Sequence, residues 1–108
     1  MGDILEYVYN DRNNTIDLLL KADGVAVDLS SVTRMIIKDI GGDWEVDEND
    51  SSGVFDRDTG VTGKVIIALG DQDITAGKYW VRLIVYDNVN TDGIVWEDPN
   101  DQFIIIVV

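Results

Sequence analysis

The sequence predicts an all-β domain, and three features support this expectation. Short turn sequences rich in Gly, Asp and Asn divide the chain at close intervals. The segments between them are rich in Val, Ile, Tyr, Trp and Thr and alternate apolar with polar positions, as strands do. No segment has a competing helical periodicity. With 108 residues the chain has the size of one domain, so we expect a single domain over residues 1–108.

Nine segments have the composition and alternation of strands. In chain order they are residues 4–10, 14–20, 33–40, 44–47, 53–56, 63–69, 78–87, 94–97 and 102–108. Because successive side chains of a strand point to opposite faces, the alternation also predicts the core. The predicted core positions are Ile16, Leu18, Leu20, Val65, Ile67, Leu69, Tyr79, Val81, Leu83, Val85, Phe103, Ile105 and Val107.

The connections between these segments contain turn signals. Asp23-Gly24 and Asp92-Gly93 predict hairpin turns, because Gly tolerates a positive φ and Asp bonds to its own backbone. Residues 71–73 predict a single helical or 3₁₀ turn between two sheets. Residues 43–60 are polar and predict a loop or a short hairpin. Pro99 cannot donate to a sheet ladder, so a bulge or a crossing between sheets is expected there.

The outward faces of the last two long segments form a candidate contact surface. The outward positions of residues 78–87 are aromatic and aliphatic beside one Arg, and residues 103–108 are apolar throughout, so their outward side chains need cover. Aromatic residues are enriched at the centres of protein interfaces. We therefore expect an interface that contains Trp80, Ile84, Tyr86, Ile104, Ile106 and Val108. A half-covered sheet surface is the alternative, because exposed apolar residues are common on sheets.

The charge of the chain limits its partners. Lys and Arg number 8 against 21 Asp and Glu, which gives a net charge of −13. Binding to nucleic acid or to anionic lipid depends on Lys and Arg, so neither nucleic acid nor a membrane is an expected partner. The sequence has no signal peptide and no run of the roughly 20 apolar residues that a membrane span needs. We expect a protein that is made and kept in a cytoplasm and binds other proteins.

The chain contains neither cysteine nor histidine. A disulfide, a zinc–thiolate site, a thiol nucleophile and the serine triad are therefore all ruled out. Paired carboxylates are the remaining route to catalysis, but with 21 acids their proximity somewhere carries no information. We predict that the protein is not an enzyme and has no catalytic, cofactor-binding or metal-binding residues.

The acidic cluster in the polar segment is the one group with metal-ligand character. It consists of Asp47, Glu48, Asn49, Asp50, Asp56 and Asp58, and calcium prefers several oxygen ligands from a flexible loop. Its spacing fails the EF-hand pattern, because Ser52 stands where Gly is required. A solvated loop is the favoured interpretation.

The three tryptophans offer a second alternative. Trp44, Trp80 and Trp96 would form a sugar-stacking platform if they were exposed together. Burial in the core or at a subunit contact is the more frequent fate of tryptophan. A carbohydrate-binding module, with Trp44 or Trp96, acidic loop groups and calcium, is therefore the alternative to a protein-binding domain.

Residues 73–79 (DITAGKY) look like a tyrosine corner, in which a Tyr near the start of a strand ties a sheet-crossing loop with its hydroxyl. This motif favours an immunoglobulin-like sandwich. The inter-sheet cysteines of such domains are absent, and Leu18 and Val81 would fill the equivalent core positions.

The order of motifs resembles that of tailed-phage immunoglobulin-like domains, such as the amino-terminal domain of baseplate upper proteins. Residues 24–33 (GVAVDLSSVT) and 35–39 (MIIKD) are similar to the family's "DG-x-PVDLTGAT-x-x-x-x-I-x-D" pattern. Residues 63–69 (GKVIIAL) and 76–79 (AGKY) resemble its "G-x-V-x-L-x-L" strand and "L-x-AG-x-Y" corner. Residues 101–107 resemble its final "F-x-I-x-V" strand.

This resemblance implies an immunoglobulin-like antiparallel β-sandwich of about seven to nine strands, without a disulfide. It implies a non-enzymatic structural or adaptor subunit of a phage virion, in the tail, the baseplate or a related part. Such a subunit would dock to copies of itself or to other virion proteins. It would be located in the virion after synthesis in the cytoplasm of a bacterial host.

Overall fold

The computed structural model describes residues 4–9, 14–22, 25–50, 53–58, 62–96 and 103–108, and all regular elements in these ranges are strands. The strands are β1 (Ile4–Val8), β2 (Thr15–Leu19), β3 (Lys21–Ala22), β4 (Val25–Ala26), β5 (Val32–Asp39), β6 (Glu45–Asp47), β7 (Phe55–Arg57), β8 (Lys64–Ala68), β9 (Gly77–Asp87), β10 (Ile94–Trp96) and β11 (Phe103–Val107). The all-β prediction is confirmed.

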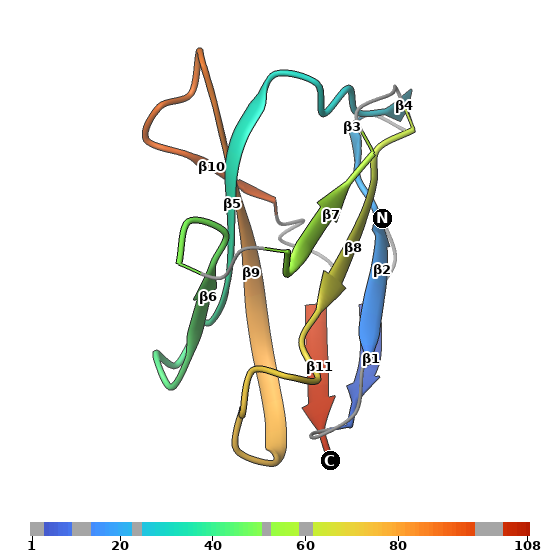
Figure 1. The fold of residues 1–108 in the computed structure, drawn as a ribbon, viewed down its shortest axis with the longest axis vertical. Coiled ribbons are helices and arrows are strands. Elements are labelled where there is room, and N and C mark those ends of the chain that lie inside the picture. Colours follow the sequence, from blue (N-terminus) through green and yellow to red (C-terminus); the bar gives the residue numbers. More distant parts are fainter. Residues whose placement is uncertain (1–3, 10–13, 23–24, 51–52, 59–61, 97–102) are drawn as a thin grey trace.

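The strands form two sheets and a small ribbon (Figure 1). The first sheet has the order β1-β11-β9-β5-β6, and β10 also pairs with β9. The second sheet has the order β2-β8-β7, and β3 pairs with β4. One cluster of buried apolar side chains takes members from both sheets, so the two sheets pack against each other as layers of a sandwich.

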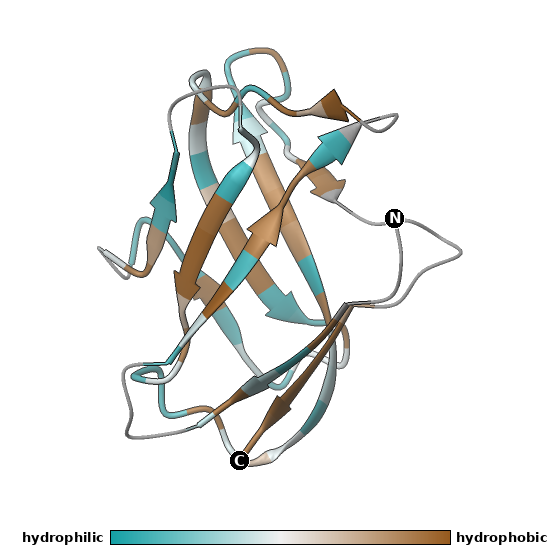
Figure 2. Cartoon of the chain, turned by 90° about the vertical axis from the view of Figure 1, so that its right-hand side faces the viewer, coloured by the Kyte–Doolittle hydropathy of each residue, from teal (hydrophilic) through white to brown (hydrophobic). Residues whose placement is uncertain are grey.

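Each of the nine predicted segments contains a strand, and the ribbon of β3 and β4 is the addition. The expectation of purely antiparallel pairing is wrong, because β1 pairs with β11 in parallel, from Ile4 opposite Phe103 to Val8 opposite Val107. Figure 2 shows the two strands side by side and pointing the same way, with β11 hydrophobic along its length. The alternation of apolar and polar residues predicts which face of the sheet each side chain occupies, but not the direction of the neighbouring strand. It therefore did not predict this parallel pairing.

The predicted core is confirmed at most positions. The predicted residues of β2 and β8, with Leu20 and Leu69 that follow them, are buried, as are Val81, Leu83 and Val85 of β9. Ile105 and Val107 of β11 are buried, whereas Phe103 and Tyr79 are partly buried and pack against the core. Each fully buried aliphatic side chain contributes about 1.5–3 kcal/mol through the hydrophobic effect.

The prediction that residues 43–60 form a loop or a short hairpin outside the core is wrong about the core. Val46 of β6, with Val54 and Phe55 at the start of β7, belongs to the buried core. β6 lies in the first sheet and β7 in the second, so this segment carries the chain from one layer to the other. Its apolar residues are few among many acids, so its composition does not indicate that they are buried.

The two strand pieces around Pro99 both pair with β9. Trp96 lies opposite Leu83, and Ile104 lies opposite Trp80. From Trp96 to Ile104 the chain advances eight positions, whereas their partners Leu83 and Trp80 on β9 are three positions apart. The segment between β10 and β11 is therefore five residues longer than the part of β9 opposite it. Pro99 itself lies outside the described residues, but its flanking strands do not cross between sheets.

The remaining turn predictions are mixed. A hydrogen-bonded turn spans residues 69–72, closed by the Gln72 backbone N–H on the Leu69 carbonyl at 3.2 Å, and residues 71–73 contain no helical turn. This segment does join the second sheet to the first. Gly93 has a φ of 87° in the turn before β10, as predicted. Asp23 and Gly24 lie outside the described residues, between strands β3 and β4, which pair antiparallel.

Candidate interaction surface

The outer face of the first sheet exposes a band of apolar side chains. Because laterally paired residues share a face, the register places Leu5, Ile104 and Trp80 in one row across β1, β11 and β9. Tyr7 and Ile106 lie in the next row. Leu5 and Tyr7 are each 53% exposed and Trp80 is 44% exposed. This band is large and aromatic, which is the character of a protein contact surface.

The structure brings five of the six predicted interface residues to this face. Trp80, Ile84 and Tyr86 alternate along β9, and on β11 Ile104 lies opposite Trp80 and Ile106 opposite Lys78. Val108 follows β11 and is exposed, and its backbone N–H donates to the Val8 carbonyl at 2.8 Å. Their role as an interface stays a prediction.

One end of this face is covered by the chain itself. Ile84 and Tyr86 are only partly exposed. A Cβ atom on Gly93 would lie 2.7 Å from Ile84 Cγ2 and 2.9 Å from a ring carbon of Tyr86, so the turn before β10 packs directly on them. The Arg34 guanidinium lies 5.0 Å from the centre of the Tyr86 ring on the same face. The open part of the surface is therefore centred on Trp80.

Leu5 and Tyr7 were missing from the predicted surface. Alternation along residues 4–8 separates them from Glu6 and Val8, so the sequence contained a signal that they share a face. What the sequence did not contain was the parallel pairing that places this face next to Ile104 and Ile106.

The same face is unusually basic for this chain. It carries four of the eight Lys and Arg residues, namely Arg34 and Lys38 of β5 and Lys78 and Arg82 of β9. Lys38 lies directly opposite Arg82, and the Lys78 ammonium lies 5.0 Å from the centre of the Trp80 ring. Among the described residues, the acids of this face are Glu45 and Asp47, at its β6 edge. On a molecule of net charge −13, this face is thus a local basic and apolar region.

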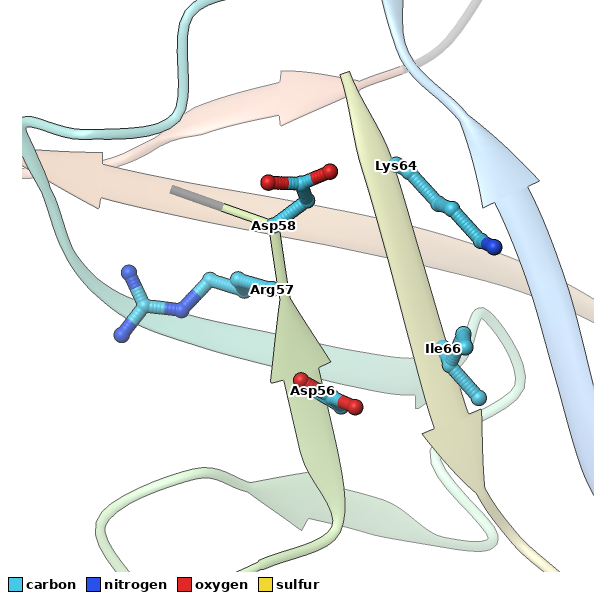
Figure 3. A pocket seen from close by; sticks show the side chains of 5 residues that line it. All are labelled: Asp56, Arg57, Asp58, Lys64 and Ile66. Carbon is cyan, nitrogen blue, oxygen red and sulfur yellow. The ribbon is translucent and has the colours of Figure 1, made fainter. Parts of the chain in front are cut away.

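The outer face of the second sheet has the opposite character. Asp17, Ile66 and Asp56 form one row across β2, β8 and β7, and Leu19 lies beside Lys64 in the next. A hollow of about 350 Å³ opens here and is lined by Asp56, Arg57, Asp58, Lys64 and Ile66 (Figure 3). Figure 3 shows the Arg57 and Lys64 side chains pointing away from each other, with Asp56 on β7, Asp58 directly after it and Ile66 on β8.

Two ion pairs hold acids of the cluster in residues 47–58, for which the sequence favours a solvated loop over a calcium site. Arg34 donates to both carboxylate oxygens of Asp47, from Nε at 2.9 Å and from Nη2. These hydrogen bonds lower the pKa of the Asp47 carboxyl. Arg57 donates to both oxygens of Glu48 at 3.1 Å and to the Val32 carbonyl at 2.6 Å. Among the described residues, no group of three or more potential metal ligands comes together.

A second pocket lies at one end of the sandwich and contains Trp44. It has a volume of about 400 Å³ and is lined by Asp43, Trp44, Gln72, Asp73, Ile74, Thr75 and Tyr79. The buried Asp39 carboxylate fixes the turn before Trp44, because it accepts hydrogen bonds from the backbone N–H groups of Gly41 at 3.2 Å and Asp43 at 3.1 Å. The Trp44 and Tyr79 rings meet edge to face, with centres 5.8 Å apart.

The sugar-stacking platform of three tryptophans, which the sequence offers as an alternative, is not assembled by the two whose side chains the structure describes. Trp44 packs against the core, whereas Trp80 lies on the outer face of the first sheet. The side chain of Trp96 is not among those that the structure describes. Any sugar site that uses Trp44 is therefore the pocket at the end of the sandwich.

Comparisons with known proteins give no identity. Neither a scan against protein-family models nor a search of curated proteins produced a match for this sequence. Within the described residues there is no helix of the length and apolar character needed to cross a membrane.

Proposed function

We propose that this chain is an immunoglobulin-like domain that serves as a non-enzymatic structural or adaptor subunit of a phage particle, in its tail, baseplate or a related part. It acts through protein contacts made by the outer face of the first sheet. The observation that carries the proposal is the exposed band of Leu5, Tyr7 and Trp80, joined to the half-buried Ile104 and Ile106.

The strand order supports the immunoglobulin-like part of this proposal. In such sandwiches one sheet contains strands B, E and D and the other contains G, F, C and C′. The second sheet here has the order β2-β8-β7, and the first continues β11-β9-β5-β6. The hydrogen bond from the Tyr79 hydroxyl to the Thr75 carbonyl, at 2.5 Å, has the geometry of a tyrosine corner and adds to this support.

The contrast between the two outer faces supports the contact function. The second sheet turns acids and a lysine to solvent, as an ordinary soluble surface does, whereas the first exposes an aromatic and aliphatic band. A monomer with no partner gains nothing from such a band, which lowers its solubility. The motif resemblance to tailed-phage domains supports a partner among other virion proteins.

Mass spectrometry of purified phage particles that encode this gene tests the proposal. We expect the chain in the particles at a fixed ratio to a known tail or baseplate protein. Particles made with Trp80→Ser should lose it, whereas particles made with the control variant Val25→Ser, at an exposed position of the β3–β4 ribbon away from both outer faces, should retain it. Complete absence of the wild-type chain from purified particles would contradict the proposal.

Carbohydrate binding is a second candidate, and the pocket around Trp44 is the observation that favours it. The pocket combines two aromatic rings with the carboxylates of Asp43 and Asp73, the Gln72 amide and the Thr75 hydroxyl, which are groups that bind sugars. Asp73 also has a φ of 53°, a conformation that is rare for a residue other than Gly.

The variant Asp73→Gly separates this candidate from the first. Gly adopts a positive φ without strain, so the variant should fold at least as stably as the wild type while it lacks one carboxylate of the pocket. If the protein binds a bacterial surface glycan on a glycan array, this variant should lose that signal and Trp80→Ser should keep it. An array with no signal for the wild type counts against the candidate.

A further inference from the structure

We propose that the outer face of the first sheet binds the outer face of the second sheet of another copy, so that the chains associate head to tail. The inference rests on the proposed contact function and names a second copy of this chain as the partner. The distribution of charge between the two faces is the observation behind it.

The two outer faces are complementary in charge. Among the described residues, the open part of the first face carries Lys38, Lys78 and Arg82 near Trp80, with one acid, Glu45, opposite Lys38 at the β6 edge. Among the described residues, the second face carries Asp17, Asp56 and Asp58 with Lys64, and Arg57 also lines its hollow. Surfaces of opposite potential attract and fix each other's register, whereas like-charged surfaces are kept apart.

A symmetric dimer through the first face is disfavoured by the same charges. A two-fold interface joins a patch to its own copy, so the basic groups of one subunit would meet those of the other. Lys38 already lies beside Arg82 within one chain, and a symmetric contact would add further cations to that pair. A head-to-tail contact instead places carboxylates opposite these cations.

The first face has a projecting aromatic side chain, and the second face has a hollow that could receive it. Trp80 stands out from the first face with the Lys78 ammonium over its ring. The second face is hollowed beside Ile66, with Asp56 and Asp58 on the β7 side (Figure 3). An aromatic ring would lie on the aliphatic Ile66 side chain, and the ammonium would reach the carboxylates. Contacts of this heterologous type leave one face free on each end, so they continue into a ring or a filament.

Two variants with one working face each test the arrangement. Lys78→Glu with Trp80→Ser disables the first face, and Asp17→Lys with Asp56→Lys disables the second. Light scattering and sedimentation at physiological salt should show wild-type chains that associate beyond a dimer as concentration rises. Each variant alone should associate at least about tenfold more weakly, because charge reversal at an interface replaces attraction with repulsion. An equimolar mixture should form dimers and nothing larger.

The outcomes separate this inference from other arrangements. If the first variant is monomeric while the second associates like wild type, the contact is symmetric and the inference is overturned. A wild type that stays monomeric at millimolar concentration also overturns it, while the proposed virion function remains, because that function is judged by the composition of purified particles. Circular dichroism of each variant verifies its fold.

A second measurement uses the unaltered protein. Zero-length carbodiimide cross-linking of mixed light and isotope-labelled wild-type chains should join Lys78 or Lys38 of one copy to Asp56 or Asp58 of another. Cross-links between copies that never pair these two faces would overturn the inference even if the variants did not fold.

Discussion

The hydroxyl of Tyr79 donates a hydrogen bond to the backbone carbonyl of Thr75 at 2.5 Å, and the Tyr79 ring meets the edge of Trp44. Thr75 belongs to the segment that carries the chain from β8 in the second sheet to β9 in the first. One side chain therefore ties the crossover to the strand that follows it and to the turn between β5 and β6.

Tyr79→Phe removes this hydrogen bond and keeps the ring. We expect the free energy of unfolding to fall by about 1 kcal/mol, because the net contribution of one intramolecular hydrogen bond has this size. Urea unfolding followed by tryptophan fluorescence measures the change, with the slope of the transition unchanged.

Tyr7→Phe is the matched control for that variant. Tyr7 lies on the exposed outer face of the first sheet, so its substitution should change stability by less than about 0.5 kcal/mol. Equal losses from the two tyrosines would show that the corner hydrogen bond does not stabilise the fold.

Neighbouring residues of β11 test the assignment of faces. Ile105 is fully buried in the core, whereas Ile104 points to the outer face and is partly exposed. Ile105→Ala should lower the free energy of unfolding by about 2–5 kcal/mol, because it leaves a cavity. Ile104→Ala should cost about 1 kcal/mol or less. Thermal and urea unfolding of the two variants under identical conditions give the comparison, and a larger loss for Ile104→Ala would reverse the assignment.

Gly63 is predicted to be intolerant of any side chain. Its φ is 67°, and a Cβ atom would lie 2.3 Å from the Leu20 carbonyl oxygen. Gly63→Ala should therefore destabilise the protein by at least about 3 kcal/mol, through backbone strain and a clash with main-chain atoms. Gly42 has a φ of 83° with no atom near such a Cβ, so Gly42→Ala should show the strain alone, about 1–2 kcal/mol. Similar losses for both variants in urea unfolding would refute the clash.

Sequence patterning predicted the core because burial follows alternation along each strand. Ile16, Leu18, Val65 and Ile67 needed only the period of two and the presence of a partner sheet, and the structure buries all four. The Tyr79 corner was predicted equally well, because its donor and acceptor are four residues apart and form a local motif.

Contacts between distant segments were beyond the reach of the sequence. The pairing of β1 with β11 joins the two ends of the described chain. The alternation of residues along a strand indicates neither which strand lies next to it nor in which direction that strand runs. For that reason the candidate surface was predicted without Leu5 and Tyr7. The turn that contains Gly93 covers Tyr86, and the path of a turn produces no periodic pattern in the sequence.

The parallel pairing of β1 gives Glu6 a position with a testable dependence on pH. Glu6 lies beside Ile105 on the inward side of the sheet, and burial, followed by repulsion from Asp17, raises the pKa of its carboxyl. A carboxyl whose pKa is higher in the folded than in the unfolded state binds its proton more tightly when folded. Its ionisation therefore destabilises the fold at neutral pH, and the loss is recovered as the pH falls through the raised pKa.

Glu6→Gln should thus increase the free energy of unfolding at pH 7, by at most about 1 kcal/mol because solvent screens a partly exposed group. The gain should shrink as the pH falls below the raised pKa of Glu6, where the wild-type side chain is also neutral. Urea unfolding at a series of pH values measures both effects. Asp17→Asn is the control and should give a smaller gain over the same range, since repulsion from Asp17 is the lesser of the two causes. A loss of stability for Glu6→Gln at pH 7 would mean that the Glu6 carboxylate has a favourable partner that outweighs its burial.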